Sequence, residues 1–112
     1  MKTSIRQLPN AIVLDVVGDI DLQNSPAMRK VLLDNLKLTK CLVVNLQQVP
    51  YIDSSGIASL VEGLKAAQNL KHRLVLYGLS KAAREVMRLT RLITVFEVYE
   101  TEEQALIGKV AG

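Results

Sequence analysis

Residues 41–57 read CLVVNLQQVPYIDSSGI, and this stretch decides the fold. Its first part, Cys41–Leu46, is the nearly continuous apolar run that is typical of a strand buried on both faces of a sheet. From Ile57 to Leu64, apolar residues recur at helical spacing instead. The chain therefore passes from a central strand into a helix through a short loop, as in parallel α/β structures.

The same two patterns recur on both sides of this stretch. Turn residues and helix-capping residues separate the segments. The expected elements are strands at 5–8 and 11–17 joined by Pro9-Asn10, a helix from Pro26 to about Leu38 capped by Asn24 or Ser25, the strand 41–46, a helix from Ser55 to about Leu70, a strand at 73–77, a helix at 81–89 capped by Ser80, a strand at 94–99, and a last helix opened by the capping box 101–104. Alternating strands and helices predict an α/β fold, with a mixed sheet of about five strands flanked by about four helices.

The bulk composition indicates one domain without a membrane span. A chain of 112 residues, 49% apolar and 22% charged, is typical of a globular protein with a single core, here expected over residues 1–112. No apolar run approaches the roughly 20 residues of a membrane span, and residues 1–6 lack the apolar core of a signal peptide. The single cysteine, Cys41, leaves no intrachain disulfide and favours the cytoplasm. The net charge of +3 does not call for nucleic acid as a partner.

Residues 53–56, Asp-Ser-Ser-Gly, lie where the strand gives way to the helix. Asp53 and Ser54 are good N-cap residues and Gly56 relaxes the turn, so capping alone, typically worth about 1 kcal/mol, can explain the segment. One cap residue suffices, however, and three polar side chains crowd this helix start. Ser55 then falls in the first turn, where free N–H groups and the helix dipole favour negative charge and the hydroxyl is expected to face solvent. Helix capping and a phosphorylation switch are both open interpretations.

A catalytic serine is the interpretation that the sequence disfavours. The one histidine, His72, follows the helix that begins at Ser55, and a rise of about 1.5 Å per residue places it more than about 20 Å from that hydroxyl. A catalytic base must lie within hydrogen-bond reach of its nucleophile. The sequence also contains neither Gly-x-Ser-x-Gly nor a phosphate-binding loop. We therefore expect a protein that is not an enzyme and has no catalytic residue, cofactor or metal.

Residues 44–56, VNLQQVPYIDSSG, resemble the signature of the STAS domain, and the nearest subgroup is the bacterial anti-sigma factor antagonists. The resemblance covers nearly the whole chain. Residues 18–21, GDID, match the family's Gly-x-Leu/Ile-Asp element, and residues 78–80 and 89–92 match its later landmarks. The family often has a second glycine where this chain has Ala58.

This resemblance implies the site residues and the partners. In the family, the serine directly before the glycine accepts phosphate, which implies Ser55. Asp21 and Asp53 would border the surface for phosphorylation and partner binding, to which Ser54, Ser55 and Gly56 also belong. The unphosphorylated protein would bind an anti-sigma factor that is also a serine kinase, and thereby release a sigma factor. Phosphorylation of Ser55 would switch that binding off and a serine phosphatase would restore it, without direct contact to nucleic acid.

Other branches of the same family leave alternatives open. Some members belong to stress-signalling assemblies, and others are small cytoplasmic subunits of lipid-transporting ABC systems, in which Ser55 would only cap its helix. The complete Asp-Ser-Ser-Gly segment favours the branch that is switched by phosphorylation.

Two charge patterns have ordinary interpretations. The helix expected at 81–89 carries a basic stripe, which is either a docking surface or, as we favour, a solvated face. Its members are Lys81, Arg84, Arg88 and Arg91. Asp15, Asp19 and Asp21 alternate and would share one face if the strand continued that far, but the spacing of a calcium loop is missing, so we favour a polar turn. His72 and Cys41 are expected in a surface loop and in the core, respectively.

Overall fold

Within residues 1–108, which the computed structural model describes, five strands form one sheet in the order β1-β2-β3-β4-β5. Only β1 runs antiparallel to its neighbour, as the predicted opening hairpin requires. Residues 109–112 of the expected domain lie outside the described part. The elements in chain order are β1 (Lys2–Leu8), β2 (Ala11–Val17), α1 (Ser25–Leu36), β3 (Cys41–Gln48), α2 (Ser54–Leu70), β4 (Arg73–Tyr77), α3 (Lys81–Leu89), the short 3₁₀ helix η1 (Leu92–Thr94), β5 (Glu97–Tyr99) and α4 (Glu102–Ile107). The predicted α/β fold with a mixed sheet is confirmed.

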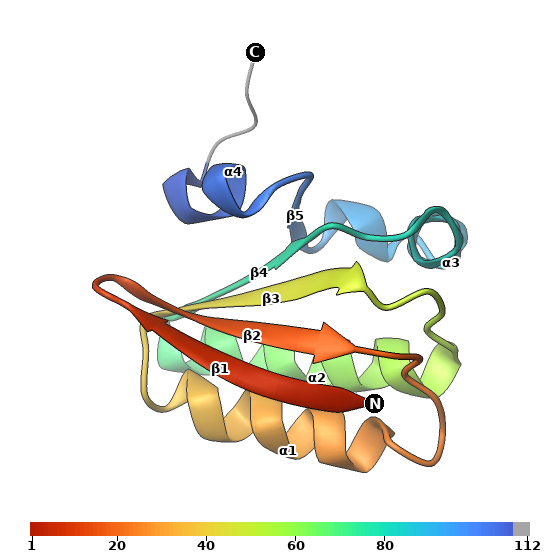
Figure 1. Ribbon diagram of the computed structural model, residues 1–112, viewed down its shortest axis with the longest axis horizontal. Coiled ribbons are helices and arrows are strands. Elements are labelled where there is room, and N and C mark those ends of the chain that lie inside the picture. Colours follow the sequence, from red (N-terminus) through yellow and green to blue (C-terminus); the bar gives the residue numbers. More distant parts are fainter. Residues whose placement is uncertain (109–112) are drawn as a thin grey trace.

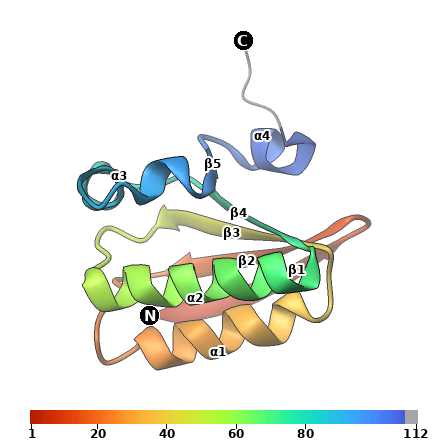
Figure 2. The same cartoon turned by 180° about the vertical axis from the view of Figure 1, so that it is seen from behind.

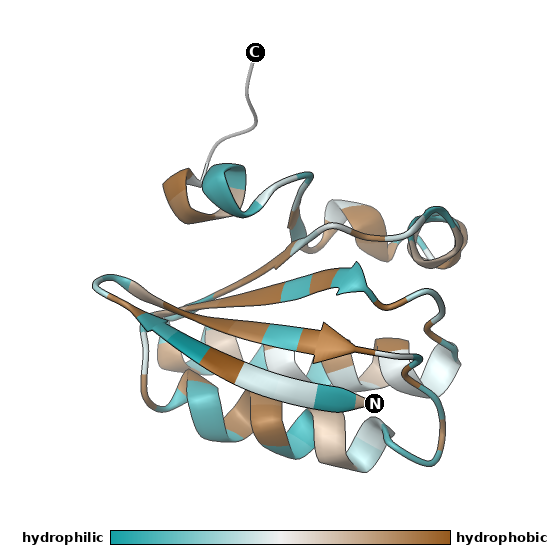
Figure 3. Cartoon of the chain, viewed as in Figure 1, coloured by the Kyte–Doolittle hydropathy of each residue, from teal (hydrophilic) through white to brown (hydrophobic). Residues whose placement is uncertain are grey.

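The sheet has two unequal faces because side chains alternate along each strand. Figure 1 shows α1 and α2 side by side against one face and α4 on the other. The face that packs against α1 and α2 presents the even-numbered residues of β2 to β4, such as Leu14, Val44 and Leu76, and it forms the main core. The odd-numbered residues, such as Val43 and Tyr77, form a smaller core beneath α4. Figure 3 shows the resulting hydrophobic character of β2 and β3 and the polar residues of the edge strand β1.

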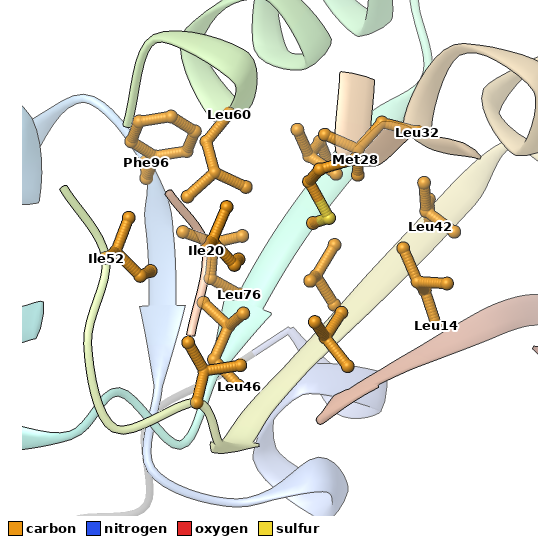
Figure 4. Close-up of a cluster of buried hydrophobic side chains, with 14 of the residues drawn as sticks. Leu14, Ile20, Met28, Leu32, Leu42, Leu46, Ile52, Leu60, Leu76 and Phe96 are labelled. Atoms are coloured by element: carbon orange, nitrogen blue, oxygen red, sulfur yellow. The ribbon is translucent and has the colours of Figure 1, made fainter. Parts of the chain in front are cut away.

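The main core joins elements that are far apart in the sequence. Figure 4 shows aliphatic side chains of the strands, of α1 and of α2 packed together with Phe96. Ala83 and Met87 of α3 belong to the same cluster. The view from behind in Figure 2 shows α1 and α2 parallel to each other across the sheet. This packing fixes where the N-terminus of α2, and with it residues 53–56, lies.

Several predicted boundaries are wrong by a few residues. β1 begins at Lys2 rather than Ile5, because the whole segment pairs with β2, and β3 continues to Gln48. The last strand, expected from Thr94, begins only at Glu97. The segment before it folds back locally, since the N–H groups of Val95 and Phe96 both donate to the carbonyl of Leu92.

The first and last helices differ from expectation at their ends. α1 ends at Leu36 rather than Leu38, where the N–H of Leu38 donates to the carbonyl of Asn35 and tightens the last turn. Asn24 is the N-cap of α1, but its side chain makes no capping bond. Thr101 caps α4 as predicted, with its Oγ1 accepting from the N–H of Gln104 at 3.2 Å. The return bond of the predicted capping box is displaced, because Gln104 accepts from the N–H of Glu100.

Candidate functional site

The segment 53–56 lies at the carboxyl edge of the sheet, in the loop between β3 and α2. Asp53 is the N-cap of α2, and its Oδ1 accepts from the backbone N–H of Gly56 at 3.0 Å. α2 consequently begins at Ser54, one residue before the predicted start. The predicted capping role of Asp53 is confirmed.

A second loop lies against this one and carries Asp21. Ile20 pairs with Ile52 in an isolated parallel bridge, in which the N–H of Asp53 donates to the carbonyl of Ile20 at 3.1 Å. Asp21 is partly exposed, and its Oδ1 accepts from the N–H groups of Gln23 and Asn24. The fold thereby brings Asp21 and Asp53, which are far apart in the sequence, onto adjacent loops.

The two serines of the segment differ in exposure and direction. Ser54 is exposed, whereas Ser55 is only partly exposed. The Ser55 hydroxyl was expected to face solvent, but it donates to Oδ1 of Asp53 at 2.5 Å. The bonds from Ser55 and from the N–H of Gly56 stabilise the carboxylate and hold the pKa of Asp53 below its ordinary value. Asp53 is therefore an anion at neutral pH, in contact with the hydroxyl that is the candidate phosphate acceptor.

The two serines also line different depressions of the protein surface. Ser55 lines a depression of about 240 Å³ between α1 and α2, together with Arg29, Ser59 and Glu62. Ser54 lines a larger, mainly apolar groove of about 450 Å³ between α2 and the α3–η1 region. Neither surface was expected from the sequence, although the spacing of positions 55, 59 and 62 places them on one face of a helix.

Gly56 is buried, and its role is dictated by packing. A Cβ atom at this position would lie 2.7 Å from Cγ2 of Ile52 and 2.8 Å from Cγ2 of Ile20. The glycine lets α2 begin in direct contact with the bridge that joins the two loops. Its predicted contribution to partner binding stays a prediction.

Two exposed apolar side chains beside the site were missed by sequence reasoning. Leu22, which follows Asp21 directly, is 74% exposed. Tyr51, two residues before Asp53, is 49% exposed. Leu22 could have been noticed as the one apolar residue between Asp21 and Pro26. Exposed apolar residues beside polar ones are typical of surfaces that bind another protein.

The other candidate residues are occupied elsewhere. His72, at the far end of α2, is bonded through Nδ1 to the carbonyl of Leu36 at 2.8 Å. Cys41 is buried as predicted, and this burial raises the pKa of its thiol. Two members of the basic stripe form ion pairs, Arg84 with Glu100 and Arg88 with Glu85.

The three alternating aspartates do not share one face. β2 ends at Val17, Asp15 forms an ion pair with Arg6, and Asp21 bonds within its own loop. In the described part of the chain, no group of three or more histidine, cysteine, aspartate or glutamate residues could hold a metal ion. No helix among residues 1–108 has the length and apolar character to cross a membrane.

Comparison with known proteins identifies the family. The model of the STAS domain matches residues 2–105. The chain belongs to the STAS domain family. The resemblance noted in the sequence is thereby confirmed. This STAS protein is 30% identical over 88 residues to an anti-sigma-B factor antagonist of Listeria monocytogenes, covering 78% of this chain and 77% of the relative.

Solved structures share the fold of this STAS protein. An anti-sigma factor antagonist from Mycobacterium paratuberculosis superposes with a TM-score of 0.83 at 23% identity, covering 96% of this chain and 92% of the other. The Bacillus cell fate determinant SpoIIAA, solved in its phosphorylated form, superposes with a TM-score of 0.72 at 17% identity, covering 95% and 97%. The unphosphorylated form of SpoIIAA gives the same TM-score, 0.72, at 14% identity, covering 96% of each chain.

Proposed function

We propose that the protein is a cytoplasmic anti-sigma factor antagonist whose binding to an anti-sigma factor with serine kinase activity is switched off by phosphorylation of Ser55. The observation that carries the proposal is the 30% identity to a relative named as an anti-sigma-B factor antagonist, combined with a complete Asp-Ser-Ser-Gly segment at a helix start. The names of the relatives describe regulators rather than enzymes. In this proposal the chain is the ligand and the substrate of its partner.

The docking surface would be formed by the two adjacent loops and the first turn of α2. Leu22 and Tyr51 supply exposed apolar area, and Asp21, Asp53 and Ser54 supply the polar rim. This combination is typical of regulated protein–protein interfaces. Ser55 would lie within the interface, since it is partly exposed between these groups.

Phosphorylation would act mainly through charge. The kinase transfers the γ-phosphoryl group of ATP to Oγ of Ser55, the bond to ADP breaks, and the hydroxyl proton is released. The product carries about −1.5 to −2 charges at pH 7. Its position in the first turn of α2, near free N–H groups, favours retention of the fold. Burying the new charge in an interface without a partner costs several kcal/mol, whereas about 1.4 kcal/mol already weakens binding tenfold.

The test maps and then removes the phosphate acceptor. We expect the protein isolated from its native cell to carry phosphate on Ser55, and the partner kinase with ATP to label the native chain and Ser54→Ala but not Ser55→Ala. Ser55→Asp should weaken binding to the anti-sigma factor at least tenfold while leaving Tm nearly unchanged. Equal labelling of Ser55→Ala and the native chain would show the assignment to be wrong. Capture of a permease and its ATPase by the tagged chain would instead support the transporter branch.

A further inference from the structure

The depression beside Ser55 contains an ion pair that joins two helices. Arg29 of α1 and Glu62 of α2 both line it, and the guanidinium binds the carboxylate across it. The pair is exposed to solvent, with 56% of the Arg29 side chain and 50% of the Glu62 side chain accessible. Exposed pairs of this kind contribute little to stability, so Arg29 can exchange partners at small cost.

The register of α1 and α2 places Arg29 and Ser55 at opposite ends of the same depression, about two helical turns apart along the helix axes. The hydroxyl of Ser59 donates to the carbonyl of Ser25 at 3.0 Å, which sets these two residues at one level. Arg29 follows Ser25 by one turn, and Ser55 precedes Ser59 by one turn. Side chains on a helix lean toward its N-terminus, so the long Arg29 side chain, once released from Glu62, can extend along the depression toward Ser55. An added phosphoryl group would shorten the remaining gap from the other side.

The present bond of Ser55 cannot survive phosphorylation. Its hydroxyl donates to Oδ1 of Asp53, and the phosphate ester has lost that proton. Two anions would then lie in contact, because Asp53 is ionised at neutral pH. Repulsion turns the phosphoryl group away from Asp53. The depression on the α1 side is lined by Arg29 and is open to receive it.

We propose that Arg29 is the counter-ion of phosphorylated Ser55 and gives up Glu62 to bind it, an inference that rests on the proposed function. A guanidinium can bind either group through two parallel hydrogen bonds, but the phosphate carries about −1.5 to −2 charges and therefore attracts Arg29 more strongly than the single charge of Glu62. The exchange leaves Glu62 as a free anion on the surface between α1 and α2. Phosphorylation thereby changes the surface charge at Glu62 as well as at Ser55.

Phosphoserine encoded at position 55 tests this exchange without a kinase. The pKa of its phosphate is read from the ³¹P chemical shift as a function of pH. With Arg29 as counter-ion, we expect Arg29→Gln to raise that pKa by about 0.5 pH unit or more, because an adjacent cation favours the dianion. Glu62→Gln should lower it, because the competing carboxylate is gone.

A matched control is available on α3. Arg88 and Glu85 form an exposed pair of similar accessibility, 62% and 52%, on another helix. Arg88→Gln should leave the phosphate pKa within about 0.1 pH unit of the native value if long-range charge effects are screened. An unchanged pKa in Arg29→Gln, or an equal shift in Arg88→Gln, overturns the inference. Absence of kinase labelling at Ser55 would contradict the proposed function, whereas the titration stands independently of the kinase.

Discussion

The helices α2 and α3 begin in the same way, at the carboxyl edge of the sheet after the parallel strands β3 and β4. Each start has one capping oxygen that accepts from the N–H three residues later at 3.0 Å, Asp53 from Gly56 and Ser80 from Ala83. The residues between cap and acceptor differ. α2 has two serines there, whereas α3 has Lys81 and Ala82.

This difference separates capping from the rest of the site. α3 shows that one side-chain oxygen is enough to start a helix at this edge of the sheet. Ser54 and Ser55 are therefore surplus to the requirement for a cap. The α2 start is also the one that contacts the second loop through Ile20, and the one that carries a partly exposed hydroxyl bonded to an anion. Extra polar groups and close packing together distinguish a candidate switch from an ordinary helix start.

The largest expected effect concerns the third position after each cap. Gly56→Ala should destabilise the fold by about 1–3 kcal/mol, because the new Cβ would overlap the side chains of Ile20 and Ile52. The Cβ would also lie 3.1 Å from the backbone carbonyl oxygen of Ile20. The matched change Ala83→Gly creates no overlap and should cost about 1–2 kcal/mol, through loss of helix propensity and of one buried methyl group. Urea denaturation of both variants measures this. Alanine is the better helix former, so a Gly56→Ala variant as stable as the native chain would show that the contact between loop and helix is loose.

The next effect concerns the caps themselves. Ser80→Ala should destabilise the protein by about 1 kcal/mol, because the N–H of Ala83 loses its acceptor. Asp53→Ala should also lower stability, while Asp53→Asn should lie between Asp53→Ala and the native chain, since asparagine keeps the capping bond but lacks the charge that the folded state favours. Thermal unfolding at neutral pH compares the three variants. If Asp53→Asn were as unstable as Asp53→Ala, the negative charge rather than the capping bond would be the stabilising feature.

The smallest expected effect is a pH dependence that Asp53, the cap of α2, has and Ser80, the cap of α3, lacks. The pKa of Asp53 is lowered in the folded state, so its stabilising contribution is complete above its ordinary value of 3.8 and is lost as the pH falls through the lower folded value. Ser80 has no group that titrates in this range. We expect the amide shift of Gly56 to follow the protonation of Asp53 below about pH 4, while that of Ala83 stays flat. In Asp53→Asn the Gly56 titration should vanish, and its persistence would assign the effect to another carboxyl.

How far the sequence predicts the structure depends on the range of the interaction. The strands at 11–17 and 73–77 and the helix at 81–89 were predicted with their observed bounds. The caps Asp53, Ser80 and Thr101 could also be predicted, because each bond spans only three residues. The late start of β5 could not, since Phe96 is drawn into the core while its own N–H closes a local turn.

The sequence by itself determined the order of strands and helices and the place of Asp-Ser-Ser-Gly at a helix start, because hydrophobic periodicity and capping are local properties. Only the tertiary structure decided that the Asp21 loop lies against the Asp53 loop, and that Arg29 shares a depression with Ser55. Those neighbours are more than twenty residues apart in the chain. Their meeting follows from the packing of α1 and α2 on one face of the sheet, which no local pattern encodes.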